Sequence, residues 1–335
     1  MSQASEFSLY ARVQGLLAGF ITSQALFVVA ELRVADELVA GPRTVQQLAV
    51  AVGAQEDQLS RVIRYLAGED VFRTDGDKVE LTDLGRALVD APGTARSTAL
   101  FYMHTHYLPF SELLHTVRTG EVGAKRFLGQ DFFPWVTESP QLSQLMTAAM
   151  ADSTGLSRGN LLADYELPPG RVVADIGGAD GTLLTSLLAR SPKHEGIVFD
   201  LPMVVAEAER TIKERGLGDR VKAVGGSFLE SVPTADTYVL SHVLHDWDTE
   251  TSLTILGNIA KAATPGARLL VVDMVVPDGN APHFTKSIDM IMMSLVGGRE
   301  RSESDWKRLL TDGGFRFERI VSGASASSLI EATLP

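Results

Sequence analysis

Apolar residues follow one pattern before residue 166 and another after it. Up to residue 165 they recur mostly at the spacing of amphipathic helices, whereas after the turn signal "ELPPG" helical stretches alternate with short continuous apolar runs. Such runs, apolar on both faces, are typical of strands in a parallel sheet that helices cover on both sides. The pattern therefore predicts two domains, a helical one over residues 1–165 and an α/β doubly wound one over residues 166–335.

Residues 44–89 have the rhythm of a winged helix. Two short helical stretches, 44–54 and 55–72, are followed by two short runs around the glycine of "RTDGDKVELT" and by a return to helix. A winged helix suggests DNA binding. However, its recognition helix offers only Arg61 and Arg64, and acidic residues flank them. We therefore favour a protein-interaction module.

The stretch at 13–30, "VQGLLAGFITSQALFVVA", is uncharged and long enough to raise the question of a membrane span. Gln14, Thr22, Ser23 and Gln24 interrupt it, and no basic cluster precedes it as in a secretory signal. We expect a buried helix, packed against a partner subunit, in a cytoplasmic protein with no membrane association.

Net charge and cysteine content narrow the possible functions. The formal net charge of −12 opposes binding to phosphate backbones and anionic lipids, so we expect no nucleic-acid partner. The chain has no cysteine, which excludes disulfides, thiolate zinc sites and cysteine nucleophiles.

A glycine-rich turn, "DIGGADGT", follows the first apolar run of the second domain. A nicotinamide fingerprint counted from Gly177 fails, because Ala179 and Thr182 stand at its later glycine positions. The spacing D-x-G-x-x-x-G fits Asp175, Gly177 and Gly181 instead. An acidic residue at a strand end can hold a cationic amine, as in S-adenosylmethionine (SAM), while the glycines let a ligand approach the backbone.

The next two runs end in residues that suit a nucleoside. Asp200 can accept hydrogen bonds from both hydroxyls of an adenosine ribose, although an Asp before Leu-Pro is also a good helix start. Ser227 and Phe228, after the third run, are suited to the edge and face of an adenine. The fourth run ends in "SHVLHDWD", where His245 and Asp246 follow apolar residues as either an ordinary strand end or a general base would.

Six blocks carry a family resemblance, in this order: "DIGGADGT", "FDLP", "GGSFLESVP", "SHVLHDWD", "LLVVDMVVP" and "GGRERSESDWKRLL". With the winged helix, they resemble the small-molecule O-methyltransferases of the plant caffeate type, and most of all their bacterial relatives acting on polyketide, phenazine and other aromatic natural products. The resemblance spans nearly the whole chain. It implies a class I methyltransferase (Rossmann-like) fold, SAM as cofactor with S-adenosylhomocysteine as product, and an intertwined homodimer formed through the winged-helix domain. In two places the chain departs from the family, which usually has glycine at Ala179 and an acid at Ser227.

The resemblance also implies catalytic roles, with His245 as general base and Asp273 and Glu300 orienting its ring. Methyl transfer from a sulfonium releases a neutral thioether, so neither an acid nor a metal is needed. The acceptor is the difficulty, because a phenol has a pKa of about 10 and imidazole one of about 6.5, so full proton transfer costs about 5 kcal/mol. A carboxylate on one ring nitrogen fixes the tautomer that leaves the other nitrogen free to accept.

Two larger sets complete the expected site. The residues expected to bind the cofactor are Asp175, Gly177, Gly178, Gly181, Asp200, Leu201, Ser227, Phe228 and Ser241. The residues expected to line an apolar acceptor pocket are His104, Tyr107, Phe133, Trp135, Met146, Met150, Asp246, Asp289, Met292 and Met293. For His104 and His106 ordinary packing remains the alternative, and their i, i+2 spacing makes a poor metal pair.

The leading hypothesis is therefore a SAM-dependent O-methyltransferase acting on a hydroxylated aromatic molecule. A SAM-binding relative with other chemistry, or a winged-helix regulator with a vestigial enzyme domain, are the rival functions. Release of S-adenosylhomocysteine in step with product would separate the first rival, and salt-sensitive DNA binding would support the second.

Overall fold

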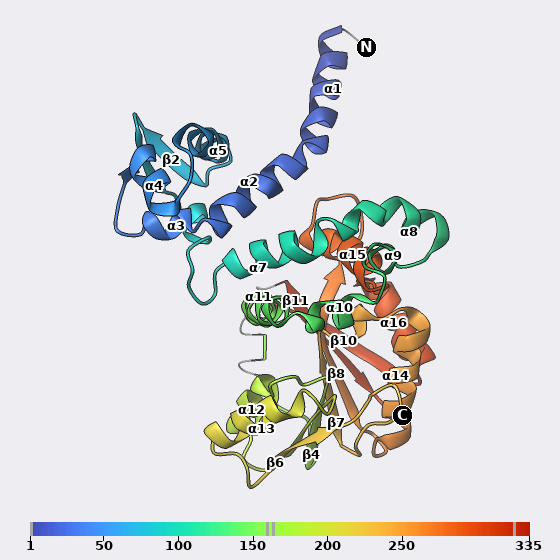
Figure 1. Ribbon diagram of the computed structural model, residues 1–335. Helices are drawn as coiled ribbons and strands as arrows, with labels where there is room; N and C mark the ends of the chain where they lie inside the picture. The colour runs from blue at the N-terminus through green and yellow to red at the C-terminus, as the bar shows by residue number, and fades with distance from the viewer. Residues whose placement is uncertain (1–2, 159–160, 163–164, 324–325) are drawn as a thin grey trace. The chain divides into compact units, whose positions relative to one another are not determined.

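The computed structural model describes residues 3–158, 161–162, 165–323 and 326–335 (Figure 1). The chain divides into two compact units: unit 1 holds residues up to 111 and residues 133–155, and unit 2 holds residues 112–132 and 156–335. The predicted domains, 1–165 and 166–335, meet at a single boundary, whereas these units exchange segments. The difference arises mainly because two helices of the 112–132 segment, α8 (Leu113–Thr119) and α9 (Gly123–Leu128), pack against α15 (Phe284–Leu295) of unit 2.

Unit 1 contains the predicted winged helix. A three-stranded sheet, in the order β1-β3-β2, packs with short helices around a buried apolar cluster that includes Leu48, Ile63 and Phe72. Thr44 begins the first helix through a capping box with Gln47, which satisfies two otherwise unpaired N–H groups. The elements are β1 (Arg43–Thr44), α4 (Val45–Val52), α5 (Glu56–Gly68), β2 (Phe72–Asp75), β3 (Lys78–Leu81) and α6 (Asp83–Arg86).

The other helices of unit 1 come from both ends of its sequence. They are α1 (Gln3–Leu17), α2 (Gly19–Glu31), α3 (Val34–Glu37), α7 (Arg96–Phe101), the π-helix η1 (Tyr102–His106), α10 (Phe132–Glu138) and α11 (Pro140–Arg158), with the 3₁₀ turn η2 (Pro109–Glu112) at the unit's edge. Residues 8–31 are long and apolar enough to span a membrane by length and composition, with only 17% of that window buried. Val13, Leu16, Leu17 and Phe20 are more than half exposed. The expected burial of this stretch is therefore not achieved within one chain.

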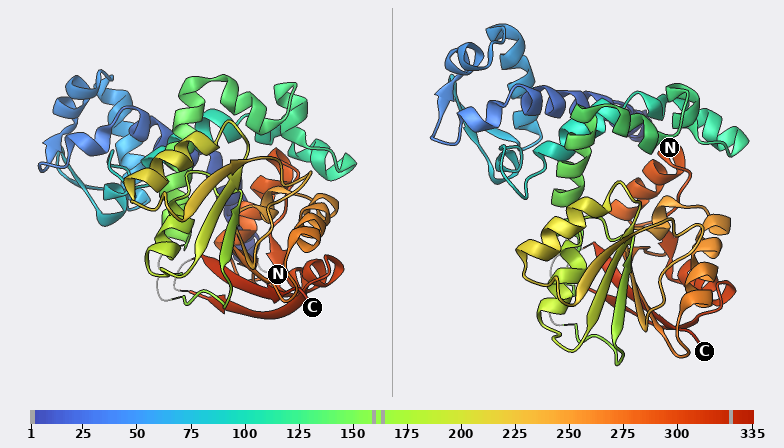
Figure 2. Two further views of the ribbon diagram at one scale, coloured as in Figure 1. Left: turned by 90° about the horizontal axis from the view of Figure 1, so that it is seen from below. Right: turned by 60° about the horizontal axis from the view of Figure 1, so that its bottom comes forward.

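Unit 2 is built on an eight-stranded sheet (Figures 1 and 2). Seven strands follow the order β10-β11-β8-β7-β4-β5-β6, and β9 pairs with β8. Strands β4 to β8 are mutually parallel, whereas β10 and β11 form an antiparallel edge. The strands are β4 (Val172–Ile176), β5 (Glu195–Asp200), β6 (Val221–Gly225), β7 (Thr237–Ser241), β8 (Arg268–Val276), β9 (Arg301–Ser302), β10 (Arg316–Ser322) and β11 (Ser327–Thr333).

Helices cover both faces of this sheet, as the continuous apolar runs predicted. On β7, Leu240 belongs to the core on the face that also buries residues of α14 (Thr249–Ala262) and α16 (Glu303–Asp312). The next residue back, Val239, belongs to the core on the opposite face with α12 (Thr182–Ala189) and α13 (Val205–Glu214). The two helix pairs lie on opposite sides of the sheet in Figure 1. The doubly wound prediction is confirmed.

The strand order also marks where a ligand would bind. β4 lies between β5 and β7, so the chain leaves β4 to one side of the sheet and later returns to its other side. In open α/β sheets the crevice for ligands lies outside the carboxyl ends of the strands at such a reversal. The glycine turn after β4 and the turn that carries His245 after β7 both lie at the carboxyl ends of these strands.

Candidate active site

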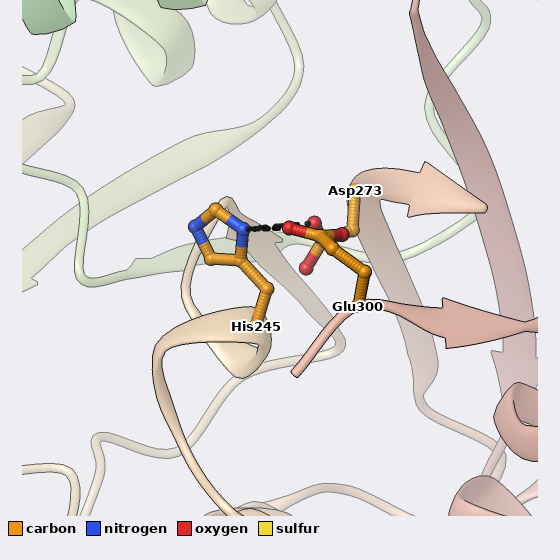
Figure 3. Close-up of side chains that lie close together, drawn as sticks. All are labelled: His245, Asp273 and Glu300. Atoms are coloured by element: carbon orange, nitrogen blue, oxygen red, sulfur yellow. Dashed lines mark hydrogen bonds and ion pairs between the residues drawn. The ribbon is translucent and has the colours of Figure 1, made fainter. Parts of the chain in front are cut away.

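The imidazole of His245 lies on a 3₁₀ turn, η3 (Leu244–Asp246), just after β7. Its Nδ1 is 2.8 Å from Oε1 of Glu300 and 3.6 Å from Oδ1 of Asp273 (Figure 3). Asp246 approaches the other ring nitrogen, with Oδ1 3.5 Å from Nε2. The structure thus brings together the three residues that were expected to form the catalytic group.

Both acidic partners of His245 are buried. Asp273 is inside β8, where Oδ1 also accepts a hydrogen bond from the Met274 N–H at 2.9 Å. Glu300 immediately precedes β9, and its own N–H donates to Oδ1 of Asp289 on α15 at 2.8 Å. Glu300 is therefore not a member of a solvated ion pair with a neighbouring arginine. Asp289 therefore holds the segment that carries Glu300, and its expected place at the acceptor stays a prediction.

This crowding of charge changes the acid–base properties of His245. Burial alone lowers the pKa of its imidazole, but attraction to Asp273, Asp246 and Glu300 outweighs burial and raises that pKa to about 10. Burial raises the pKa of Asp246 to about 6, even though His245 pulls it down, and burial also raises the pKa of Glu300. Three carboxyl groups therefore compete to stabilise one imidazolium.

A second histidine adjoins the turn. His242 has a left-handed backbone, with φ of +55°, and its Nε2 is 3.0 Å from the Ser327 hydroxyl on β11. Its ring is 5.6 Å from the ring of His245, and its Nδ1 is 3.3 Å from the hydroxyl of Ser241. The sequence analysis did not single out His242. Its position three residues before His245 was the only local signal.

The turn between β4 and α12 is shaped by backbone conformation. Gly177, Ala179 and Gly181 all have positive φ, of +71°, +46° and +73°. Only glycine adopts this region without strain, so Ala179 is the costly member. A Cβ on Gly178 would lie 3.0 Å from the carboxyl carbon of Asp175, a buried residue, so the loop packs tightly on the strand end.

Asp200 binds this loop and caps no helix. Its Oδ2 accepts from the N–H of Ala179 at 2.9 Å, and Oδ1 accepts from the N–H of Leu201 at 2.7 Å. The next helix begins only at Val205, so the helix-start alternative is wrong. Each carboxylate oxygen still has a second lone pair. Asp200 can therefore hold the glycine turn and accept from ribose hydroxyls at the same time.

Phe228, Ser227 and Leu201 are further cofactor candidates that follow the ends of β5 and β6. The ring of Phe228 meets the indole of Trp247 edge to face at 5.9 Å, and its carbonyl accepts from Asn258. The hydroxyl of Ser227 accepts a weak hydrogen bond from the N–H of Leu229 at 3.3 Å. Leu201 is 46% exposed. An aromatic face and an exposed apolar side chain are thus available at this edge.

The expected acceptor residues are divided between the two units. Those in unit 1 are His104, Tyr107, Phe133, Trp135, Met146 and Met150, and those in unit 2 are Asp246, Asp289, Met292 and Met293. In unit 1, His104 is exposed, lies 3.5 Å from Glu31 and meets Phe27 edge to face. His106 is buried, and burial lowers its pKa to about 3, so it is a neutral packing residue.

His245, Asp273 and Glu300 also place three donor atoms within 4.8 Å of one another, a spacing that a metal ion could bridge. The 2.8 Å hydrogen bond between His245 and Glu300 accounts for this closeness without an ion.

Known proteins resemble the chain over nearly its full length. The phenazine O-methyltransferase PhzM of Lysobacter antibioticus is 34% identical over 95% of this chain and 94% of its own. The structure of the mitomycin 7-O-methyltransferase MmcR matches with a TM-score of 0.91 and 34% identity over all of both chains. NcsB1, an O-methyltransferase from neocarzinostatin biosynthesis solved with SAM and 2-hydroxy-5-methyl naphthoic acid, matches with a TM-score of 0.81 and 33% identity, covering 94% of this chain and 96% of its own.

Family assignment agrees with these matches. Residues 14–91 match the O-methyltransferase dimerisation domain, and residues 110–316 match the O-methyltransferase domain. The second match alone covers more than half of the chain and contains the glycine turn, the His245 turn and both acidic partners of His245. The chain therefore belongs to the O-methyltransferase family and carries both of its domains.

Proposed function

We propose that this enzyme methylates a hydroxyl group on an aromatic small molecule with SAM as methyl donor, and that His245 takes the hydroxyl proton. One observation carries the proposal: an imidazole anchored through Nδ1 by Glu300 lies at the same sheet edge as a glycine turn of the SAM type. The similarity to methyltransferases named for phenazine, mitomycin and naphthoate substrates supports an aromatic acceptor.

The residues present at this edge fit SAM. Asp175 and Asp200, at the ends of β4 and β5, supply negative charge for an amine and acceptors for ribose hydroxyls. Positive φ at Gly177 and Gly181 keeps side chains away from the turn before α12. When bound, SAM supplies an electrophilic methyl group on a sulfonium. At position 227, where the family usually has an acid, this chain has a serine, whose hydroxyl can bond to the edge of the adenine.

His245 is suited to move the acceptor's proton because its pKa matches that of a phenol. With the imidazole at its ordinary pKa of about 6.5, proton transfer from a phenol of pKa about 10 costs about 5 kcal/mol. The carboxylates around His245 raise its pKa to about 10, so transfer to the neutral imidazole becomes nearly isoenergetic. The O–H bond breaks as the new C–O bond forms, and the proton goes to Nε2 while Nδ1–H donates to Glu300.

The same shift predicts an alkaline optimum. In the free enzyme the imidazole is protonated at neutral pH, so the pair of acceptor hydroxyl and His245 must lose one proton before methyl transfer. For pKa values of about 10, this loss costs about 4 kcal/mol at pH 7 and less at higher pH. Activity should therefore rise with pH from neutrality towards the pKa of the pair.

The apolar face of α1 and α2 supports a homodimer. Its large side chains are exposed in the single chain, and most of this face falls within the matched dimerisation domain, which begins at residue 14. We propose that a second copy covers this face and that the dimer works in the cytoplasm. A partner subunit would remove the apolar surface from water more simply than a membrane would.

The proposal is tested by His245→Ala in the full chain, with SAM and a panel of phenolic acceptors. We expect methyl transfer, followed as release of S-adenosylhomocysteine and as a mass gain of one CH₂, to fall by roughly a hundredfold or more. His194→Ala is the matched control, because His194 is a part-buried histidine of the same unit that precedes β5 at the opposite ends of the strands. Unchanged turnover by His245→Ala would end the base assignment, and an active wild type without S-adenosylhomocysteine release would end the methyltransfer proposal.

A further inference from the structure

Arg301 is an almost fully buried arginine beside the active site. Its side chain donates through Nη1 to the carbonyl of Leu244 at 2.7 Å and through Nη2 to the carbonyl of Trp247 at 3.1 Å. Nη2 also donates to the hydroxyl of Ser252, on α14, at 2.9 Å. The two carbonyls lie on either side of His245, so one guanidinium spans the turn that carries the proposed base.

The backbone next to Arg301 grips the same turn. The N–H of Arg299 donates to the carbonyl of His245 at 2.9 Å. Gly298 packs so closely that a Cβ there would lie 2.1 Å from that carbonyl oxygen. The segment 298–301 therefore binds three backbone carbonyls of the His245 turn, those of residues 244, 245 and 247. Glu300 lies within this segment.

Stability alone does not explain a charged residue here. Among the described residues, no carboxylate lies within 4.0 Å of the guanidinium, which instead stacks over the ring of Trp306 at 5.3 Å. Burial lowers the pKa of Arg301, which reflects the cost of holding its charge away from water. An apolar side chain would fill the space without that cost. The guanidinium is favoured where a fixed fork of donors must reach two acceptors.

We infer that Arg301 is a positioning residue, which clamps the His245 turn to the Glu300 segment so that the Nδ1 to Oε1 hydrogen bond forms in the right place. The inference rests on the proposed role of His245. Arg301 acts through the carbonyls of Leu244 and Trp247 and through the Ser252 hydroxyl. It holds both partners of the His245–Glu300 hydrogen bond because it follows Glu300 directly in the chain. Lysine keeps the charge but replaces the planar fork by a single ammonium on a flexible stem, so we expect it to hold the carbonyls of Leu244 and Trp247 less firmly.

The test is Arg301→Lys in the full chain, with Arg268→Lys as the matched control. Arg268 is another arginine of unit 2; it is partly buried at the start of β8, where it pairs with Glu331 at 3.0 Å. The main readout is the pKa of His245, followed by NMR in protein with labelled histidine. The charged or titratable groups that face this ring are Asp246, Asp273, Glu300 and His242.

In Arg301→Lys we expect the pKa of His245 to fall by roughly one unit or more, because a loosened turn weakens the contact with Glu300. We expect kcat to fall roughly tenfold to a hundredfold, with KM for SAM nearly unchanged, since the glycine turn and Asp200 are not touched. Arg268→Lys should change neither the His245 pKa nor kcat beyond any loss of folded protein.

A folded Arg301→Lys protein with a wild-type His245 pKa would overturn the inference, whatever its kcat. If Arg301→Lys does not fold, Ser252→Ala decides, because it removes one partner of the same guanidinium; an unshifted His245 pKa there would overturn the inference too. The NMR readout needs no catalysis. A failure of the clamp is therefore distinguishable from a failure of the proposed function, which His245→Ala tests separately.

Discussion

Two neighbouring regions at the carboxyl ends of the parallel strands hold their candidate functional groups in place by different means. At the ends of β7 and β8, side chains are fixed by other side chains: Glu300 holds His245, and Asp289 holds the backbone of Glu300. At the ends of β4 and β5 the backbone itself is shaped, through the positive φ of Gly177 and Gly181. Two carboxylates hold this turn: Asp200 accepts from the N–H of Ala179, and Asp180 accepts from the N–H and the hydroxyl of Thr182.

The difference follows from the tasks that we propose for the two regions, proton transfer at the first and nucleoside binding at the second. A proton moves over less than 1 Å and responds to every nearby charge, so its site needs a defined set of charged groups, and three carboxyl groups raise the pKa of His245. A nucleoside is large and needs room close to the main chain, so its site needs missing side chains. We therefore expect substitutions at the first region to change kcat and its pH profile, and substitutions at the second to change cofactor affinity.

The largest effect in this comparison is expected for Glu300→Gln. The amide keeps the shape and an acceptor oxygen but removes a negative charge beside the imidazole, so the pKa of His245 falls below about 10. On the alkaline plateau, where wild-type His245 has lost its extra proton, a weaker, less well oriented base should lower kcat by roughly tenfold to a hundredfold. The acidic limb of the pH–rate profile should move to lower pH, while KM for SAM stays close to wild type.

The measurement is kcat across neutral and alkaline pH at saturating SAM. Glu303→Gln is the control, because Glu303 lies three residues further on, at the exposed start of α16, where it pairs with Lys307. A Glu300→Gln profile that coincides with wild type, or that moves to higher pH, would show that Glu300 does not set the basicity of His245.

A smaller effect is expected for Asp200→Asn, and it concerns cofactor affinity where that of Glu300→Gln concerns kcat. This change weakens the acceptor for the N–H of Ala179 and removes the charge suited to ribose hydroxyls. Affinity for S-adenosylhomocysteine, measured by calorimetry, should fall roughly tenfold or more, since hydrogen bonds to charged groups are worth about 1.5–3 kcal/mol. At saturating SAM, kcat should change little. Asp219→Asn, an exposed residue before β6, is the control, and equal affinity in both variants would remove Asp200 from the cofactor site.

The pattern of apolar and polar residues over short segments predicted the buried strands and the winged helix, because short segments determine these elements. The runs at 172–177 and 237–244 became β4 and β7, because strands buried on both faces must be continuously apolar. The winged helix was predictable because its caps and glycine turn are encoded within a few residues. His245 was identified from its place at a strand end, but its partners Asp273 and Glu300 came from the family resemblance.

What the sequence did not predict depends on contacts between distant residues. The antiparallel edge of β10 and β11 left no distinctive run, yet it brings Ser327 to His242, 85 positions earlier. The hydrogen bond from the N–H of Glu300 to Asp289 was not predicted either, because it joins residues of different elements that no local pattern links. The apolar stretch at 13–30 was expected to be buried, but in the single chain only its last part is: Ala25, Val29 and Ala30 are buried, whereas Val13, Leu16, Leu17 and Phe20 are more than half exposed.

The smallest effect is expected from a matched pair of substitutions in the glycine turn, Gly177→Ala and Ala179→Gly. Left-handed backbone costs a residue with a Cβ about 1–2 kcal/mol, so Ala179→Gly relieves strain at φ of +46°. The extra freedom of glycine in the unfolded chain offsets about 0.4–1 kcal/mol of that gain. The thermal midpoint of Ala179→Gly should therefore rise by no more than a few degrees.

Gly177→Ala should destabilise the protein by about 1–3 kcal/mol, because it adds the same strain and brings a Cβ to 2.8 Å from Val243. Val243 precedes the His245 turn, so this one substitution strains both regions of the comparison. If kcat falls in Gly177→Ala while affinity for S-adenosylhomocysteine holds, the backbone turn also positions the proton site, and the two regions are mechanically coupled. If Ala179→Gly lowers the midpoint, left-handed strain at Ala179 is absent, and the turn is held by Asp200 in a conformation that alanine adopts without cost.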